Sequence, residues 1–195
     1  SMAEPNAQLD VAIIGAGMSG LCMGMKLLER GISNFAIYEK SADLGGTWHD
    51  NTYPGACCDV ASVLYSFSFA PNPNWSQKYS PHHEIKAYFR DCAERYGIVP
   101  MLRLSTEVEA AHWQEELGHW ELQLAGGERV TARSLVCALG QLNLPYIPDF
   151  PGRDLFTGHT FHSARWDHEY DLKGKRVAII GNAASALQFI PHVAK

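Results

Sequence analysis

The residues best suited to chemistry stand in a glycine-rich turn near the start of the chain. Gly15, Gly17 and Gly20 form the pattern G-x-G-x-x-G. The first glycine permits a tight turn, the second lacks the Cβ that would block a pyrophosphate, and the third lets a helix pack closely on a strand. The N–H groups and the dipole at a helix N-terminus favour an anionic phosphate. The spacing therefore predicts a phosphate-binding turn.

An acidic residue at a suitable distance makes this prediction more specific. Glu39 follows Gly20 by about 20 residues, the separation expected for a carboxylate that binds the ribose of a dinucleotide. Its two oxygens can accept hydrogen bonds from both ribose hydroxyls. A purely structural turn is the alternative, because glycine-rich turns are common. The turn and the acid together favour dinucleotide binding by residues 11–39.

The residues around the turn indicate the elements that must position it. The run 9–14 is short and apolar, as in a buried parallel strand. Residues 19–30 carry apolar side chains at helical spacing, and Gly31 suits the position that ends a helix. The run 35–38 predicts a second strand. A strand, a helix and a strand within about 30 residues form a right-handed βαβ unit.

The next segments predict an antiparallel insertion. Residues 40–80 are irregular and rich in glycine, proline and aromatic residues, which indicates a functional loop. Ser80 as N-cap and Pro81 as the first helical residue predict a helix that ends before residue 97. Alternation over 102–137 predicts an antiparallel meander, and 134–140 predicts a buried return strand.

The C-terminal segments predict the start of a second domain. Prolines interrupt the stretch that follows residue 144, which indicates a linker. Residues 176–180 predict another apolar strand before a turn at Gly181. One strand and one helix cannot bury a sheet by themselves, so we expect the sequence to stop inside a domain.

The composition limits the classes of function. The 195 residues are 46% hydrophobic and 19% charged, as in an ordinary globular protein. A net charge of −5 without a basic run argues against nucleic acid as a partner. No stretch approaches the roughly 20 apolar residues that span a bilayer. No signal peptide is visible, and Ser1-Met2 resembles the remnant of a removed tag.

The cysteines and histidines indicate neither disulfides nor a metal site. The five cysteines are odd in number and match no zinc pattern. Cys22, Cys92 and Cys137 have apolar neighbours, among which a thiol acts as a small hydrophobic group. The nine histidines form no pair with metal-ligand spacing. We expect a reduced, cytoplasmic protein with no bound metal.

Three further stretches resemble the Baeyer–Villiger monooxygenases, a family of flavin-dependent enzymes. Residues 45–59 are similar to the family's run G-G-T-W-x-x-N-x-Y-P-G-x-x-C-D, which lies over the flavin. Residues 138–152 are similar to its proline-rich crossing between two domains, with Leu139 in place of the usual threonine. Residues 156–167 match the fingerprint F-x-G-x-x-x-H-x-x-x-W-[PD]. Loop packing is the alternative for single residues, and a plain linker for the second stretch.

The resemblance implies an α/β fold that binds FAD first and NADPH second. We expect a Rossmann-type FAD-binding domain with an antiparallel β insertion at 8–144, an interdomain linker with the fingerprint at 145–174, and the start of a Rossmann-type NADPH-binding domain at 175–195. The residues expected to bind FAD are Gly15, Gly17, Gly20, Glu39, Gly46, Thr47, Trp48, Asp59, Tyr65, Val108 and Gly140.

The second nucleotide turn departs from the usual pattern. Gly181 and Ser185 are the residues expected to bind NADPH there. Ala183 and Ala186 replace the second and third glycines. Alanine is compatible with helix–strand packing at the third position, but Ala183 adds a methyl group near the pyrophosphate.

The resemblance also implies the reaction. NADPH reduces FAD, the reduced flavin reacts with O₂, and one oxygen atom is inserted beside the carbonyl of a small-molecule ketone, which gives an ester or a lactone. Asp59 and His162 are the candidate catalytic residues. For Asp59, the family places the matching acid beside an arginine that lies outside this sequence, and a loop-closing hydrogen bond is the alternative. For His162, a role that links domain position to the active site is favoured over proton transfer.

Two other functions remain open from the sequence. One is a flavin monooxygenase that oxidises nitrogen or sulfur, although such enzymes usually carry Tyr or Phe at the position of Trp166. The other is a non-catalytic nucleotide-binding fragment, which the abrupt end of the second domain favours. Neither the ketone nor the oligomeric state follows from the sequence.

Overall fold

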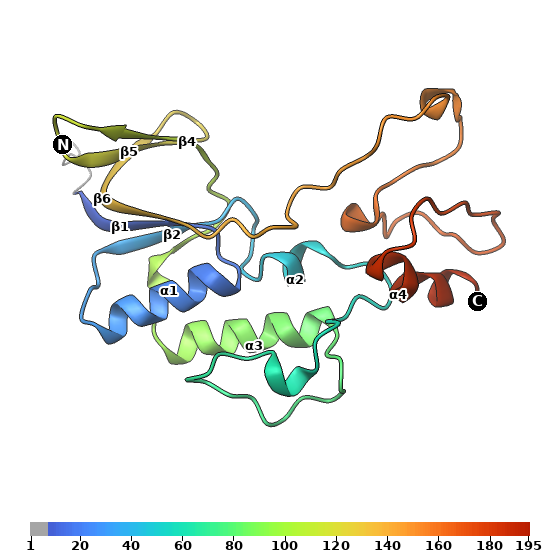
Figure 1. Ribbon diagram of the computed structural model, residues 1–195, viewed down its shortest axis with the longest axis horizontal. Helices are drawn as coiled ribbons and strands as arrows, with labels where there is room; N and C mark the ends of the chain where they lie inside the picture. The colour runs from blue at the N-terminus through green and yellow to red at the C-terminus, as the bar shows by residue number, and fades with distance from the viewer. Residues whose placement is uncertain (1–7) are drawn as a thin grey trace. The chain divides into compact units, whose positions relative to one another are not determined.

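The structure is a computed structural model that describes residues 8–195 (Figure 1). The pair Ser1-Met2 lies outside the described residues. The chain forms two compact units. The first unit extends to Gly46 and includes Lys86–Gln141, and the second joins Thr47–Ile85 to Leu142–Lys195. These units are groupings by contact, and the domain bounds expected above remain predictions.

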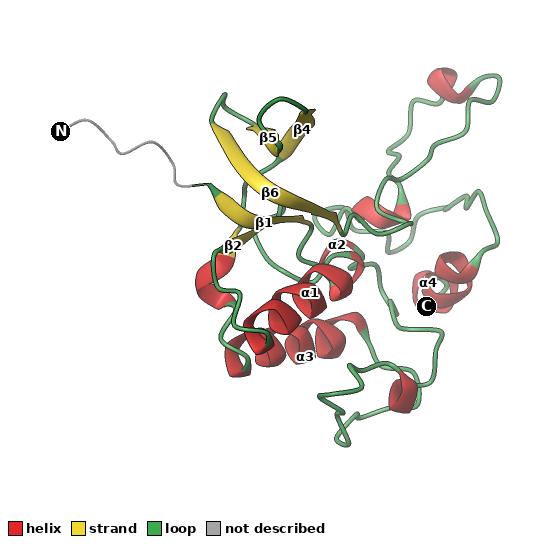
Figure 2. Cartoon of the chain, turned by 60° about the vertical axis from the view of Figure 1, so that its left-hand side comes forward, coloured by secondary structure: helices red, strands yellow, loops and turns green. Residues whose placement is uncertain are grey.

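The first unit is built on a six-stranded mixed sheet with strand order β3-β2-β1-β6-β5-β4. β1 pairs in parallel with β2 and with β6, whereas β5 pairs antiparallel with β4 and with β6 (Figure 2). The order confirms the α/β fold with an antiparallel insertion. The strands are β1 (Leu9–Ile14), β2 (Phe35–Tyr38), β3 (Leu102–Arg103), β4 (Val108–Gln114), β5 (His119–Leu124) and β6 (Arg129–Cys137).

The predicted βαβ unit is present, with the two strands at the expected bounds and the helix shifted by one residue. Helix α1 (Met18–Glu29) joins β1 to β2, and Gly31 follows it with a φ of +78°, the left-handed conformation that ends a helix. A Cβ on Gly24 would lie 2.8 Å from Cδ1 of Ile37, so α1 approaches β2 closely at this glycine. The third helix, α3 (His82–Arg95), is followed by a short 3₁₀ turn, η2 (Val99–Met101), that leads into β3.

The core of the first unit has two parts. One is a cluster that the parallel strands share with the antiparallel strands of the same sheet, and it includes Ala12, Leu122 and Ala132, all fully buried. The other side of β1 and β2 contributes Ile13 and Ile37, which are fully buried as well. Because side chains on both faces of these parallel strands are buried, the strands are apolar throughout rather than alternating.

The second unit has little regular structure. Its elements are α2 (Thr47–Asp50), η1 (Ser62–Leu64), the first turn of α3, η3 (Arg153–Leu155), η4 (Ser163–Arg165) and α4 (Ala184–Val193). Its buried cluster consists of Tyr53, Ala56, Ala186 and Phe189, with Trp166 and Val193 packed against it. The cluster therefore joins residues from the two ends of this unit's sequence.

Four sequence expectations are wrong in detail. Ser80 does not cap α3, because its Oγ lies 2.6 Å from the Oγ of Ser62, and Pro81 supplies the carbonyl that accepts the first helical N–H groups. The residues at 102–103 do not belong to the meander, since β3 pairs in parallel with β2. The return strand and the last strand of the meander are one strand, β6, and Cys137 at its end is exposed.

The fourth difference concerns residues 176–180, which form no strand. Val177, Ile179 and Ile180 are exposed, and Ile180 retains 76% of its accessible surface. A strand is defined by hydrogen bonds to a neighbouring strand. Within residues 8–195 no neighbour pairs with this segment, so its apolar sequence forms no strand. Within the same residues, no helix has the length and apolar character that crossing a membrane requires.

We predict that Ile37→Ala lowers the free energy of unfolding by about 2–5 kcal/mol, because it removes a fully buried side chain at the contact between β2 and α1. Urea denaturation measures the change. Ile32→Ala is the matched control, since Ile32 is 37% exposed, and its effect should stay below about 1 kcal/mol. Equal losses in the two variants would contradict the assignment of Ile37 to the core.

Candidate functional site

The first glycine of the turn is fixed by a close approach between backbones. Gly15 has a φ of +104°, and its N–H donates to the carbonyl of Tyr38 at 2.8 Å. A Cβ at this position would lie 2.4 Å from the carbonyl oxygen of Ala138 at the end of β6. Any side chain would therefore force the backbones apart, so the turn requires glycine here.

The second glycine faces another glycine loop. The N–H of Gly45 donates to the carbonyl of Ala16 at 2.9 Å, which holds the two loops together. A Cβ on Gly17 would meet the Cα of Gly46 at 3.6 Å, and a Cβ on Gly46 would meet the Cα of Gly17 at 3.0 Å. Side chains at these positions would fill the space between the loops. The bare backbone suits a pyrophosphate that passes between them.

The third glycine holds α1 close to the turn. A Cβ on Gly20 would lie 1.8 Å from the carbonyl oxygen of Gly15. Helix α1 begins at Met18, and no side chain caps its N-terminus. Its first N–H groups therefore remain available to an anion at the turn.

Glu39 binds the turn directly, an interaction that the sequence does not indicate. Its Oε2 accepts a hydrogen bond from the N–H of Ala16 at 2.8 Å, and its Oε1 accepts from the N–H of Ser41 at 2.9 Å. The residue is only 8% exposed. Because each carboxylate oxygen can accept more than one hydrogen bond, Glu39 retains capacity for ribose hydroxyls.

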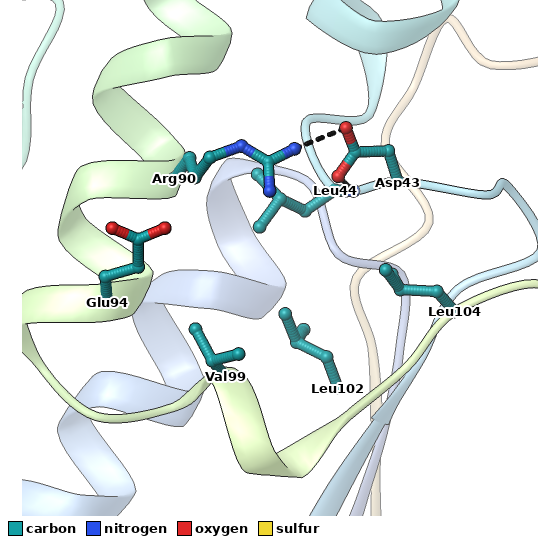
Figure 3. Close-up of a pocket in the computed structure, with 7 residues that line it drawn as sticks. All are labelled: Asp43, Leu44, Arg90, Glu94, Val99, Leu102 and Leu104. Carbon is teal, nitrogen blue, oxygen red and sulfur yellow. Dashed lines mark hydrogen bonds and ion pairs between the residues drawn. The ribbon is translucent and has the colours of Figure 1, made fainter.

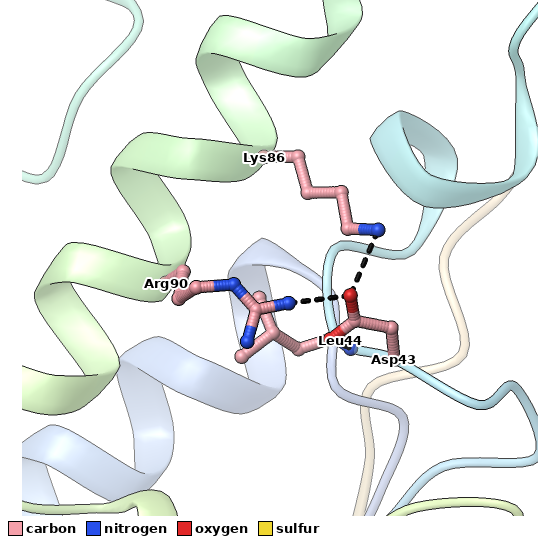
Figure 4. A network of polar contacts seen from close by, with 4 residues as sticks. All are labelled: Asp43, Leu44, Lys86 and Arg90. Carbon is pink, nitrogen blue, oxygen red and sulfur yellow. Dashed lines mark hydrogen bonds and ion pairs between the residues drawn. The ribbon is translucent and has the colours of Figure 1, made fainter.

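A small ionic network anchors the loop that carries Gly45 and Gly46 (Figure 4). The Oδ2 of Asp43 binds Lys86 Nζ at 2.9 Å and also the guanidinium of Arg90, and both basic residues lie on α3. Its Oδ1 accepts from the N–H of Leu44 at 2.8 Å. Burial alone would raise the pKa of Asp43, but the hydrogen bonds from Lys86 and Leu44 outweigh it and hold the pKa below its ordinary value.

An open pocket of about 300 Å³ adjoins this network (Figure 3). Apolar side chains and the Asp43–Arg90 pair line it, and no glycine of the phosphate-binding turn does. It is therefore distinct from the turn itself. The lining residues are Asp43, Leu44, Arg90, Glu94, Val99, Leu102 and Leu104.

Trp48 and Tyr65, two residues of the second unit that are predicted to bind FAD, contact each other. The indole N–H of Trp48 donates to the hydroxyl of Tyr65 at 3.0 Å, and the rings contact edge to face with centroids 5.6 Å apart. Burial raises the pKa of Tyr65 despite the hydrogen bond from Trp48. The pair fixes the orientation of both rings.

The remaining predicted cofactor residues lie as follows. Thr47 is the exposed first residue of α2, and Val108 begins β4 beside a β-bulge. Gly140 and Gly181 adopt φ values of +72° and +116°, which favour glycine. Ser185 lies in the first turn of α4, near the Tyr53 hydroxyl, and this contact acts to lower the pKa of Tyr53. Burial nevertheless raises the pKa of Tyr53.

The two candidate catalytic residues differ in environment. Asp59 is exposed. It contributes to the raised pKa of the Cys57 thiol, for which burial is the main cause. His162 precedes η4, where its Nδ1 accepts a hydrogen bond from the N–H of Ala164 at 3.0 Å. This bond uses one ring nitrogen of His162 to cap a turn.

The fingerprint segment contributes mainly aromatic contacts to the second unit. Trp166 contacts Phe161 edge to face at 5.0 Å and contacts Phe189 of α4 at 5.3 Å, measured between ring centroids. Asp167 binds His159 Nε2 at 2.8 Å. Within residues 8–195, no group of three or more His, Cys, Asp or Glu residues is arranged to hold a metal ion.

Comparisons with known proteins place the chain in a family of flavin-binding enzymes. The family described as "Flavin-binding monooxygenase-like" matches residues 8–195. A Baeyer–Villiger monooxygenase of Streptomyces coelicolor is 48% identical over 94% of this chain and 35% of its own length. The chain thus spans about a third of the length of such relatives.

Solved structures show the same likeness. An oxidised steroid monooxygenase bound to NADP is 40% identical, with a TM-score of 0.86 over 96% of this chain and 37% of its own. The OTEMO complex with FAD and NADP is 33% identical, with a TM-score of 0.88 over 97% of this chain and 38% of its own. The resemblance noted in the sequence is confirmed.

We predict that Asp43→Asn destabilises the protein at neutral pH by about 1 kcal/mol, less than a buried hydrogen bond to a charged group contributes, because the network is partly exposed. The pKa of Asp43 is lower in the folded than in the unfolded state. The carboxylate therefore stabilises the fold above the unfolded pKa of about 3.9, and this contribution disappears as the pH falls through the folded pKa.

Urea midpoints measured between pH 3 and pH 7 test this. Asp91→Asn is the control, since its ion pair with Arg95 is more exposed, and it should change the midpoint less. A difference between wild type and Asp43→Asn that grew toward low pH would contradict the network's role.

Proposed function

We propose, on the premise that the chain belongs to the flavin-binding monooxygenase-like family, that it is part of an FAD- and NADPH-dependent Baeyer–Villiger monooxygenase. The complete enzyme would insert one oxygen atom of O₂ into a ketone to give an ester or a lactone. The observation that carries the proposal is the cradle of Gly17, Gly46 and Glu39, whose bare backbone and buried carboxylate fit a pyrophosphate and a ribose.

The bound cofactor would supply the redox chemistry, and this chain's residues would bind and orient it. The first N–H groups of α1 would hold the phosphates, and Glu39 would accept the adenosine ribose hydroxyls. Trp48 and Tyr65, held to each other by their hydrogen bond, would supply rigid aromatic surface beside the cofactor. Thr47, Val108 and Gly140 are also proposed to bind the cofactor.

The second nucleotide would bind at the N-terminus of α4. Gly181 provides the left-handed turn, and no side chain caps the helix at Ala183. Ser185, in the first helical turn, would contact the NADPH phosphates. Asp59 would lie near the reacting centre. Its side chain is exposed and therefore available to the arginine that the family resemblance implies.

His162 supports a positioning role better than proton transfer. Its Nδ1 already accepts the N–H of Ala164, and the histidine lies in the segment that also carries Trp166. We propose that both residues relay position through the second unit. The free cysteines support a cytoplasmic location for the enzyme.

The fingerprint favours a ketone over a sulfide or an amine as the substrate, because Trp166 stands where heteroatom-oxidising relatives usually carry Tyr or Phe. The relatives named above include Baeyer–Villiger and steroid monooxygenases. The test is to follow NADPH oxidation by the complete protein over matched panels of ketones and sulfides and to analyse the products. Sulfoxides without any ester would establish the heteroatom-oxidising alternative, and no oxidation of either panel would favour a non-catalytic nucleotide-binding protein.

We predict that Gly17→Val abolishes FAD retention by the complete protein, because a branched side chain would occupy the space between the two glycine loops. The absorbance ratio of flavin to protein after gel filtration measures the loss. Ala125→Val, in an exposed turn of the hairpin, should keep the wild-type ratio. A fully loaded yellow Gly17→Val protein would refute the site.

We predict that Glu39→Ala weakens FAD binding by about 1–3 kcal/mol, the range for hydrogen bonds to a charged group. Titration of FAD into apoprotein measures the affinity. Since Glu39 also accepts from Ala16, the melting temperature of the apoprotein should fall too. Glu109→Ala, an exposed change on β4, is the control. Unchanged FAD affinity together with a lower melting temperature would mean that Glu39 supports only the turn.

A further inference from the structure

Helix α4 is bonded to residues 53–57 through a single amide side chain. The Oε1 of Gln188 accepts a hydrogen bond from the hydroxyl of Tyr53 at 2.7 Å and a longer one from the N–H of Cys57 at 3.4 Å. Its Nε2 donates to the carbonyl of Cys57 at 2.9 Å. The amide thus matches both the donor and the acceptor of one backbone residue, as a neighbouring strand would.

Close packing accompanies these hydrogen bonds. A Cβ on Gly55, whose φ is +79°, would lie 2.7 Å from the carbonyl of Gln188, so the loop backbone contacts the helix backbone. The ring of Tyr53 meets Phe189 edge to face at 6.0 Å between centroids. Phe189 in turn contacts Trp166 of the fingerprint segment. Loop 53–57 therefore cannot shift along α4 without breaking several contacts at once.

The position of Gln188 on α4 relates it to the second nucleotide turn. Ser185 lies three residues earlier, and residues three apart share one face of a helix. The hydroxyl of Tyr53 donates to Gln188, and Ser185 is near enough to this hydroxyl to lower its pKa. Burial raises the pKa of Tyr53, so its hydroxyl keeps the proton that it donates. One phenol thus links a predicted nucleotide-binding serine to the residue that holds loop 53–57.

An apolar residue would serve if packing were the only requirement at position 188. Gln188 is half-buried and has neighbours such as Phe189 and Ala186 that form the apolar cluster. Placing a polar amide there costs free energy unless its bonds are made. The hydrogen bonds of the Gln188 amide are all made to residues of loop 53–57. This indicates that the role of Gln188 is to orient the loop.

We propose that Gln188 is a positioning residue that makes loop 53–57 follow helix α4, so that a nucleotide bound at the N-terminus of α4 also orders the loop. The coupling rests on the proposed function, because it requires NADP(H) at the second turn and flavin near the run 45–59. By linkage, whatever stabilises the loop would also strengthen nucleotide binding by the same factor.

Hydrogen exchange followed by mass spectrometry on the FAD-loaded complete protein tests the coupling, with and without NADP⁺. Gln188→Met keeps the length of the side chain and removes its hydrogen bonds. Without nucleotide, we expect roughly fivefold to tenfold faster exchange in the peptide that contains Cys57, the factor for one neutral hydrogen bond. With NADP⁺, the wild-type peptide should gain protection, and the variant should lose most of that gain.

Two further variants keep the test decisive. Gln123→Met makes the same substitution at an exposed position of β5 and should behave as wild type. Tyr53→Phe removes the hydrogen bond to Gln188 but keeps the ring against Phe189, and it replaces Gln188→Met if that variant does not fold. The flavin absorbance should stay unchanged in all of them, which excludes global loss of structure.

The outcomes separate the coupling from the proposed function. Equal protection by NADP⁺ in wild type and Gln188→Met would overturn the coupling while leaving nucleotide binding intact. NADP⁺ that binds the wild type without protecting the peptide would overturn it as well. Failure of NADP⁺ to bind the wild type in a direct titration would remove the proposed function and the coupling together.

Discussion

The parallel pairing of β1 with β2 is the constraint on which the candidate site depends. In a parallel pair the carboxyl ends of both strands lie at one edge of the sheet. The register that sets Ile14 opposite Tyr38 brings the glycine turn after β1 next to the acid after β2. Two hydrogen bonds result, from Gly15 N–H to the Tyr38 carbonyl and from Ala16 N–H to the Glu39 carboxylate. They hold the turn in place by contacts within the protein alone.

Backbone contact explains why the residues of the turn cannot be exchanged. Gly15 contacts the end of β6, and Gly20 contacts Gly15 itself, so both are needed for the fold. Gly17 is different, because a Cβ there would meet only the neighbouring glycine loop at an ordinary distance. The fold could tolerate a small side chain at this position, but under the proposed function that side chain would occupy the space of the pyrophosphate. Gly17 is thus the glycine of the turn for which the proposed cofactor, rather than the fold, supplies the requirement.

Local patterns could be predicted from the sequence, and long-range partners could not. The βαβ unit, the left-handed Gly31 and the antiparallel hairpin follow from short-range spacing. The sequence predicts that Ser80 caps a helix, but its hydroxyl bonds to that of Ser62, a partner that no local pattern reveals. Residues 176–180 have the composition of a strand, yet strand formation depends on a neighbour. The bonds of Glu39 to Ala16 and of Gln188 to Cys57 also join distant segments.

In the second unit, side-chain contacts fix the conformation of segments that have little regular secondary structure. Its carbonyl and amide groups at Cys57 are satisfied by a side chain rather than by a strand. Its apolar cluster uses rings from separate segments, among them Tyr53, Trp166 and Phe189. Large rigid rings bury much surface with few rotatable bonds, so they fix position at a low entropic cost. Trp166 therefore has a structural reason to stand in the fingerprint, whereas His162 beside it caps a turn. The ring contact of Trp166 and the hydrogen bond of His162 support the proposed role of both residues in positioning.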